Sequence, residues 1–364
     1  MIRVAFLSYE YPPVGGGAGS VVYDIFNNTS YDNYFLYTND HAQGAQKRIY
    51  KIKEKWFLKI LGGAGRYLSF FFSVGKEFSN YDVIVLNDFF SHIYAALFFD
   101  DLMLSKCVFY MHGQELQSLE AHRSIFFRTL NIAKRVKHAY KTSMKLIFVS
   151  DFLKSDFHNR IGINISNIIM SKSVVINNGI ADSFRPSFNE YNNSEKVEIV
   201  SASRLIEGKG YVEMLEHLAP ILLTKKNYLW RIIGDGPLLE DLQSEVNRLG
   251  LTDKVFFLGR RNREELPEIY NKSSVFLLLS KFEEAHPLVY MEAAVCGLPS
   301  IAFNRGGCAE SVMDGVTGFL INDYYELESS INDCICLDKK EIVKSSDLYS
   351  IKNTIRKLRQ ELSG

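Results

Sequence analysis

An apolar run from Val275 to Leu279 leads into a turn with two acidic residues and then into a segment with a helical pattern. A short apolar run of this kind is typical of a buried strand in a parallel sheet. We expect Pro287 at the first helical position, where its fixed φ is already suitable. The helix should end at Cys296-Gly297, because Pro299 prevents its continuation. The stretch predicts a βα unit whose loop and helix both carry a glutamate.

The two glutamates of this unit, Glu284 and Glu292, are separated by seven residues. One lies in the loop and the other about two turns into the helix. Both can face a ligand above the helix N-terminus, where free N–H groups and the helix dipole favour a phosphate. The alternative is a βα unit with ordinary solvated acids. That interpretation suits a single glutamate better than it suits the whole string of residues 280–299.

The alternation of strand, turn and helix occurs in both halves of the chain. Ile2–Ser8 is predicted as a strand before a glycine-rich loop and a helix over Ser20–Asn27, and Val197–Ala202 restarts the pattern. This order is typical of doubly wound α/β folds, so we predict two Rossmann-like domains. The predicted boundaries are a first domain over residues 1–180, a polar linker over 181–196, a second domain over 197–338 and a charged helical tail over 339–364.

The composition limits what such a protein does. Its 364 residues suffice for two domains, and 47% apolar with 23% charged residues fits a soluble globular protein. Lysine plus arginine equals aspartate plus glutamate at 42 each, which argues against a nucleic-acid partner. The five cysteines form no C-x2-C pair, which indicates reduced thiols. Without a signal peptide or an apolar stretch of roughly 18 residues, we expect a cytoplasmic protein, at most peripheral at the inner face of the membrane.

Gly15, Gly16 and Gly17 follow the first predicted strand. Consecutive glycines let the backbone approach a ligand closely and turn its N–H groups toward an anion. The spacing is not G-x-G-x-x-G, and no acidic residue follows at the distance that a ribose contact needs, so a dinucleotide site is not indicated. From composition alone, a flexible turn is an equally good interpretation.

Arg204 and Lys209 bracket a glycine turn after the strand over Val197–Ala202. Two fixed cations at the end of a strand can neutralise a diphosphate leaving group without a metal ion. The alternative is an ordinary surface charge pair. Gly234 and Arg260 follow the next two predicted strands in the same way.

The strand predicted over Lys106–Met111 ends at His112, and Glu115 follows closely. Open α/β sheets bind ligands at the carboxyl ends of their strands. A lone histidine is more often a satisfied structural residue, so position alone makes these two residues candidates and no more.

Residues 47–61 combine basic and aromatic side chains, including Lys51, Lys53, Lys55 and Trp56. One interpretation is an amphipathic surface on an anionic membrane, where each basic residue adds about 1 kcal/mol. The other, which we favour, is a solvated helix face with a few anchoring aromatics. Phe70–Phe72 either extend that surface or pack in the core.

The string of residues 280–299 resembles the E-x7-E signature of the retaining, nucleotide-sugar-dependent glycosyltransferases of the GT-B fold, the large family usually numbered 4. In that family the string commonly runs Glu-Gly-Phe-Pro-Leu-Val, then Glu-Ala and Cys-Gly-x-Pro. Here Ala285-His286 stands in place of Gly-Phe. Further stretches that resemble the family are Pro12–Gly16, Asn177–Gly179, Ser203–Gly210, Gly306–Glu310 and Asp314–Phe319.

The resemblance implies two Rossmann-like domains facing across a cleft, with a C-terminal tail that often returns to the first domain. It implies transfer of a sugar from a nucleoside diphosphate to a glycan or lipid-linked acceptor, with no cofactor. Because the chain has no Asp-x-Asp motif, metal dependence is not expected.

The resemblance also assigns residues. Glu284 and His112 would orient the transferred sugar, and Glu292 would bind the ribose hydroxyls. The implied catalytic residues are Glu284, His112, Arg204 and Lys209. The other implied contacts are Gly16, Gly17, His286, Pro287, Leu288 and Val289 for the donor, Gly234 and Arg260 near the nucleobase, and Glu115 for the acceptor.

Two alternatives stay open at this point. One is a nucleotide-sugar-binding or glycan-binding protein of the same fold that has lost catalysis, which the Ala285-His286 departure permits. The other is a nucleotide-sugar 2-epimerase. A phosphorylase-like transferase would need the sequence context of a pyridoxal lysine, which the chain lacks.

Overall fold

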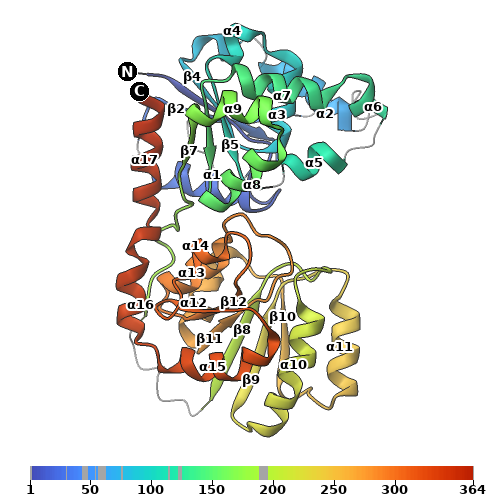
Figure 1. The fold of residues 1–364 in the computed structure, drawn as a ribbon, viewed down its shortest axis with the longest axis vertical. Helices are drawn as coiled ribbons and strands as arrows, with labels where there is room; N and C mark the ends of the chain where they lie inside the picture. The colour runs from blue at the N-terminus through green and yellow to red at the C-terminus, as the bar shows by residue number, and fades with distance from the viewer. Residues whose placement is uncertain are drawn as a thin grey trace. The chain divides into compact units, whose positions relative to one another are not determined.

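The structure, a computed structural model, describes residues 2–29, 31–42, 48–53, 55, 63–74, 77–113, 115–121, 125–187 and 196–363. It divides into two compact units, Met1–Gly179 with Ile351–Gly364, and Ile180–Ser350. Each unit is built on its own parallel sheet flanked by helices (Figure 1). The predicted fold class of two Rossmann-like α/β domains is confirmed.

The first unit has a seven-stranded sheet in the order β3-β2-β1-β4-β5-β6-β7. Strands β1, β4 and β5 are buried at every residue, as expected for a parallel sheet covered on both faces. The strands are β1 (Val4–Leu7), β2 (Tyr34–Asn39), β3 (Ile49–Ile52), β4 (Val83–Leu86), β5 (Cys107–Met111), β6 (Lys145–Phe148) and β7 (Ser173–Val175). The helices are α1 (Gly17–Asn27), α2 (Gly63–Val74), α3 (Phe89–Phe98), α4 (Asp101–Leu104), α5 (Glu115–Ala121), α6 (Ile125–Thr129), α7 (Ile132–Thr142), α8 (Asp151–Arg160), α9 (Ile163–Ile169) and α17 (Ile351–Ser363).

The second unit has a six-stranded sheet in the order β10-β9-β8-β11-β12-β13. Helices α10 and α11 lie to one side of it and α12 and α13 to the other (Figure 1). The strands are β8 (Val197–Ala202), β9 (Tyr228–Ile233), β10 (Val255–Gly259), β11 (Val275–Leu277), β12 (Ser300–Phe303) and β13 (Gly318–Ile321). The helices are α10 (Tyr211–Thr224), α11 (Leu239–Arg248), α12 (Leu266–Lys272), α13 (Leu288–Val295), α14 (Cys308–Ser311), α15 (Leu327–Cys336) and α16 (Lys339–Ser345).

The βα unit around β11 and α13 differs from its prediction at two boundaries. The strand ends at Leu277, although Leu278 and Leu279 are also buried. Pro287 is the N-cap of α13 rather than its first helical residue, because its ψ of 115° is extended. At the other end Cys296 is the C-cap, and Gly297 has a φ of 76°, which confirms the predicted helix end.

The predicted tail, residues 339–364, is divided between the two units. Helix α16 belongs to the second unit and α17 to the first. In the predicted linker, Phe184 is buried in the core of the second unit, whereas residues 188–195 lie outside the described residues.

Helix α17 is amphipathic and packs on the first unit. Ile351, Ile355, Leu358 and Leu362 are buried at helical spacing. Thr354 Oγ1 donates to the Asn177 carbonyl at 2.8 Å, and Lys145 Nζ forms an ion pair with Glu361 Oε2 at 2.6 Å. The C-terminal residues are therefore integral to a unit whose sheet begins at residue 4.

The basic and aromatic stretch at 47–61 is described only in part. Ile49–Ile52 form the edge strand β3, so a helix face is the wrong interpretation for these four residues. Trp56 and residues 57–61 lie outside the described residues, and the lipid contact stays a prediction. Phe70 is buried in the core, as one alternative predicted, whereas Phe71 and Phe72 are 39% and 60% exposed, and whether they extend the basic and aromatic surface stays a prediction.

Two further findings concern possible membrane-spanning helices and the cysteines. Within the described residues, no helix combines the length and the apolar character that crossing a bilayer requires. The five cysteines are free thiols, and four of them are buried.

Gly179 allows the contact between α17 and the end of the first sheet, which gives a stability prediction. A Cβ atom at Gly179 would lie 2.5 Å from Ile351 Cα and 2.7 Å from Thr354 Oγ1. We expect Gly179→Ala to lower the free energy of unfolding by about 1–3 kcal/mol, the usual range for overpacking. Urea denaturation measures it.

Gly17→Ala is the matched control, because a Cβ atom there meets nothing within 4 Å. Equal stability of the Gly179 variant and the wild type would show that α17 does not dock as described.

Candidate functional site

The order of the second sheet reverses between β8 and β11, which are adjacent although β9 and β10 separate them in the chain. Ligands of open α/β sheets bind at such a switch point, beside the carboxyl ends of the strands. The loops after β8 and β11 meet there, since Lys281 N donates to the Gly208 carbonyl at 2.7 Å. This contact brings the two sequence-predicted clusters together.

Lys209 and Glu284 form an ion pair at the switch point. Lys209 Nζ lies 2.5 Å from Glu284 Oε1, and Ser280 Oγ donates to the same oxygen at 2.8 Å. The side chains are only 17% and 21% exposed, so water screens this pair less than it would a surface pair. Lys209 Nζ also lies 5.7 Å from the centre of the Phe282 ring. The sequence predicted both residues as ligand contacts but did not predict that they bind each other.

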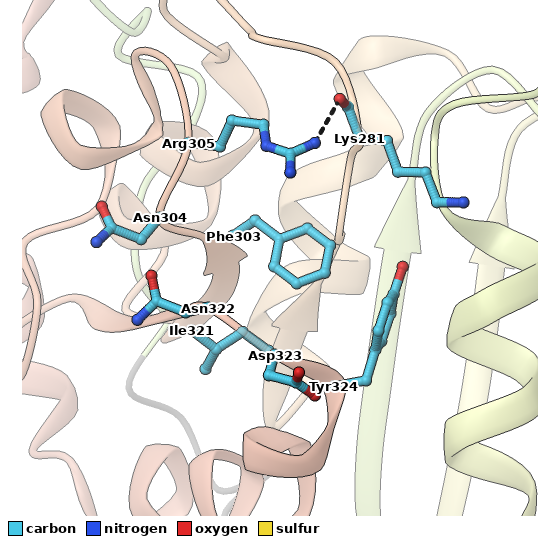
Figure 2. Close-up of a pocket in the computed structure, with 8 residues that line it drawn as sticks. All are labelled: Lys281, Phe303, Asn304, Arg305, Ile321, Asn322, Asp323 and Tyr324. Atoms are coloured by element: carbon cyan, nitrogen blue, oxygen red, sulfur yellow. Dashed lines mark hydrogen bonds between the residues drawn. The ribbon is translucent and has the colours of Figure 1, made fainter.

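The loop after β12 packs against the turn that carries Glu284 and forms hydrogen bonds with it. Gly307 N donates to the Glu284 carbonyl at 2.6 Å. A Cβ atom at Gly307 would collide with the Ala285 carbonyl oxygen, so only glycine permits this approach. Arg305 Nη1 donates to the Lys281 carbonyl at 2.9 Å (Figure 2). The loop that carries Glu284 is thus held on two sides.

The N-terminus of α13 begins directly after this turn. Leu288 and Val289 are its first helical residues, and both are half-buried. The first N–H groups of a helix have no partner within the helix, and together with the dipole they favour an anion. The predicted backbone contacts at Pro287, Leu288 and Val289 therefore lie at a helix end that suits an anion. Glu284, which forms the ion pair with Lys209, lies in the turn before this helix end.

Glu292 is buried on α13 and has a partner that sequence analysis missed. Arg263 Nη2 and Nε lie 2.7 Å and 3.0 Å from Glu292 Oε1. The Arg263 guanidinium also lies 5.1 Å from the centre of the Phe184 ring. Nothing in the local pattern relates Arg263 to Glu292, because 29 residues separate them. A ribose contact by Glu292 would involve a carboxylate that is already held by a cation.

The remaining predicted residues of this unit occupy the expected strand ends. Arg204 and Arg260 are exposed after β8 and β10. Gly234 N donates to the Gly259 carbonyl at 3.0 Å, which joins the ends of β9 and β10. The structure does not bring Arg204 into the Lys209–Glu284 ion pair.

The side chain of His286 is buried rather than exposed to a ligand. Burial lowers the pKa of His286 to about 4, while the main chain of Glu310 acts in the opposite direction. The ring is therefore neutral at neutral pH.

In the first unit the strand order reverses between β1 and β4. Glu10, which follows β1, was not predicted. Its carboxylate accepts from Gly16 N at 2.8 Å, and its own N–H donates to Asp88 Oδ2 at 2.7 Å. The N–H group of Gly16 that was predicted to face a donor phosphate thus binds a carboxylate of the chain itself. Burial raises the pKa of Asp88 to about 6.

Glu115 holds the turn that carries His112. Its two carboxylate oxygens accept from His112 N at 2.7 Å and from Gly113 N at 2.8 Å. The Glu115 side chain is buried, and burial raises its pKa. This arrangement indicates a structural role, and the predicted contact with an acceptor stays a prediction.

His112 is half-buried at the end of β5. Its Nε2 lies 3.3 Å from Asn87 Oδ1, and its ring packs on Tyr110 with centres 4.7 Å apart. Burial, with a contribution from the nearby His92, lowers the pKa of His112 to about 3. His112 is therefore a neutral imidazole at neutral pH.

A cavity of about 380 Å³ opens beside the Glu284 loop, at the ends of β12 and β13. Figure 2 shows the Phe303 ring at its centre with polar side chains around it. Two of its lining residues, Lys281 and Arg305, also form the hydrogen bond that holds the Glu284 loop. Lys209, Glu284 and Glu292 do not line the cavity. Its lining residues are Lys281, Phe303, Asn304, Arg305, Ile321, Asn322, Asp323 and Tyr324. Among the described residues, no three acidic, histidine or cysteine side chains are grouped as metal ligands.

Two family models match the chain, one for each half. Residues 15–184 match Glycosyltransferase Family 4, and residues 184–341 match Glycosyl transferases group 1. A GDP-mannose-dependent alpha-(1-6)-phosphatidylinositol monomannoside mannosyltransferase of Mycolicibacterium smegmatis is 29% identical over 153 residues, 40% of each chain. The N-acetyl-alpha-D-glucosaminyl L-malate synthase of Bacillus anthracis is 33% identical over 132 residues, 36% of this chain and 34% of the synthase. The aligned part spans less than half the length of these curated relatives.

Solved structures share the whole fold. Anabaena HepE in complex with UDP superposes with a TM-score of 0.77 and 21% identity over 100% of both chains. WaaG, a glycosyltransferase involved in lipopolysaccharide biosynthesis, superposes with a TM-score of 0.70 and 16% identity over 99% of this chain and 100% of WaaG. At these identities the likeness concerns the fold.

The buried ring of His286 gives a prediction about acid stability. The unfolded chain binds a proton at this residue from about pH 6.5 downward, whereas the folded protein does so only near pH 4. Unfolding therefore takes up a proton in this window, and stability falls as the pH falls through it. We expect His286→Phe to remove roughly 3 kcal/mol of the loss between pH 7 and pH 4.

Urea denaturation at both pH values measures the difference. His41→Gln is the control, since the His41 side chain is 71% exposed. An identical pH dependence of the wild type and His286→Phe would contradict the buried, neutral state of this ring.

Proposed function

The chain belongs to the glycosyltransferases of group 1 and family 4, and from this membership we propose that it transfers a sugar from a nucleoside diphosphate to an acceptor hydroxyl. The observation that carries the proposal is the Lys209–Glu284 ion pair at the switch point of the second sheet, directly before the N-terminus of α13. A cation, a carboxylate and free N–H groups converge there. Polysaccharide or lipid-linked glycan assembly is the proposed setting.

The positive groups suit a diphosphate leaving group. Lys209 lies at the switch point, Arg204 is exposed at the start of the same loop, and the first N–H groups of α13 follow Glu284. Fixed positive charge aimed at the oxygen atoms on which charge develops lowers the barrier to transfer. A diphosphate would compete with Glu284 for Lys209 and so release the carboxylate toward the sugar.

The residues keep the roles that the family suggests. Glu284 positions the transferred sugar beside its oxocarbenium-like centre, and Glu292 binds the ribose while Arg263 holds its carboxylate. His112 contacts the sugar. We assign no covalent nucleophile: the departing phosphate takes the acceptor proton on the same face of the sugar, so the product keeps the anomeric configuration.

A substitution at Glu284 tests the site. We expect Glu284→Gln to lower turnover by about 100-fold or more, the usual effect of removing a group that acts in the transition state. The amide keeps an oxygen that accepts from Ser280 Oγ, so we expect the protein to stay folded, with some loss of stability because the ion pair is lost. Lys209→Ala should have a similar effect. Loss of each nucleotide sugar from a panel of UDP and GDP sugars, with isolated membranes as acceptor, measures the turnover.

Glu283→Gln is the matched control, because this neighbouring carboxylate is exposed and we expect its variant to keep the wild-type rate. The anomeric proton coupling of the product reports retention. Full activity of Glu284→Gln would rule out the site, and no turnover of any donor in the panel would favour a binding protein that has lost catalysis.

We also propose that the reaction needs no metal ion. Lys209, Arg204 and the N-terminus of α13 offer positive charge where a metal ion would otherwise neutralise the diphosphate. Turnover should therefore be the same with EDTA as with added Mg²⁺. A loss of activity in EDTA that Mg²⁺ restores would contradict the proposal.

A further inference from the structure

Asn87 lies at the switch point of the first sheet and has no predicted role. It follows β4, is fully buried, and its amide makes three contacts. Its Nδ2 donates to the Ala18 carbonyl and to Ser8 Oγ, both at 3.0 Å. Its Oδ1 lies 3.3 Å from Nε2 of His112.

These partners allow only one orientation of the Asn87 amide. The Ala18 carbonyl oxygen can only accept, so the amide nitrogen must face it. Ser8 Oγ donates its hydrogen to the Glu10 carbonyl at 2.7 Å and is free to accept from Asn87. A flipped amide would place two oxygen atoms in contact and lose both hydrogen bonds. Asn87 Oδ1 is therefore fixed toward His112.

The orientation of Asn87 determines which nitrogen of His112 carries the hydrogen. Because Asn87 Oδ1 can only accept, Nε2 of the neutral imidazole must be the donor. The other nitrogen, Nδ1, then has a lone pair and no hydrogen. No described residue forms a hydrogen bond with Nδ1.

We propose that Asn87 is a positioning residue, which fixes His112 as the Nε2–H tautomer and so presents Nδ1 as an acceptor for a hydroxyl group of the ligand. Each phosphorus of a nucleotide-sugar diphosphate has a single acidic hydroxyl, which is ionised at neutral pH, so this face of His112 selects against that diphosphate and for a sugar hydroxyl. The Glu115 carboxylate accepts a hydrogen bond from the main chain of His112, and the Tyr110 ring packs against the imidazole. These contacts fix the direction of the Nδ1 lone pair. The choice of a sugar hydroxyl rests on the proposed function, but the tautomer does not.

Nuclear magnetic resonance of the full chain labelled with ¹³C,¹⁵N-histidine tests the proposal. Correlations between ring nitrogens and ring carbon protons distinguish the two tautomers and the imidazolium ion, and His112→Gln assigns the His112 signals. We expect a single Nε2–H tautomer of His112 in the wild type at neutral pH. The Nδ1–H tautomer or an imidazolium ion would overturn the proposal without any variant.

Asn87→Ala removes the acceptor and should give a mixture of both tautomers of His112. His92 is an internal reference, because its Nε2 lies 3.1 Å from the Leu86 carbonyl and needs no help from Asn87. Asn39→Ala is the matched control: this buried asparagine ends β2 and donates to the Tyr9 carbonyl at 2.6 Å, without touching His112. A pure Nε2–H tautomer in Asn87→Ala would show that Asn87 does not fix the ring.

A titration with dimethyl phosphate, a phosphodiester that is fully ionised at neutral pH, tests the selection against phosphate. We expect the His112 signals to stay those of the neutral ring, whereas conversion to the imidazolium ion would overturn that part of the proposal. If the protein transfers sugar, Asn87→Ala should also lower kcat/KM by about tenfold, the value of one oriented hydrogen bond. A protein without transferase activity would still show or lack the single tautomer, so the two proposals fail separately.

Discussion

The ion pair between Lys209 and Glu284 depends on a reversal of strand order, and the candidate site depends on the ion pair. The loops after β8 and β11 are neighbours only because the sheet changes direction between these strands. At 2.5 Å and partly removed from water, neither charge can lose its partner without a large penalty unless another charge replaces it. A ligand that brings its own negative charge supplies that replacement. The pair therefore stabilises the two loops, and in the proposed reaction the diphosphate would supply that replacement.

In the first unit, negative rather than positive side chains lie at the ends of β1 and β5. Glu10 fills the glycine loop and Glu115 lies beneath the His112 turn, so carboxylates of the chain already bind the main-chain N–H groups there. His112 is neutral, with a pKa near 3. A phosphate would meet carboxylates and an uncharged imidazole on this side. Neutral hydroxyl groups suit these partners better than a phosphate does.

Much of the fold could be predicted from local patterns. The apolar runs identified strands of both sheets, and the predicted end of α13 at Cys296-Gly297 was correct. Errors arose where an edge position changed the pattern, as in β3, whose mixed polar and aromatic residues were taken for a helix face. Pro287 was placed one residue too far into its helix, because an extended ψ at the cap leaves no trace in the sequence.

What the sequence determined by itself was the list of chemical groups at the strand ends: Lys209, Glu284 and Glu292 in one half, His112 in the other. Their order along the chain and the resemblance of their motifs indicated a sugar transferase. Only the tertiary structure decided which groups meet. Arg263 binds Glu292, Glu10 occupies the glycine loop and Asn87 orients His112. These contacts join residues that no local pattern relates, because the order of strands in a sheet, and not the distance along the chain, determines which loops are neighbours.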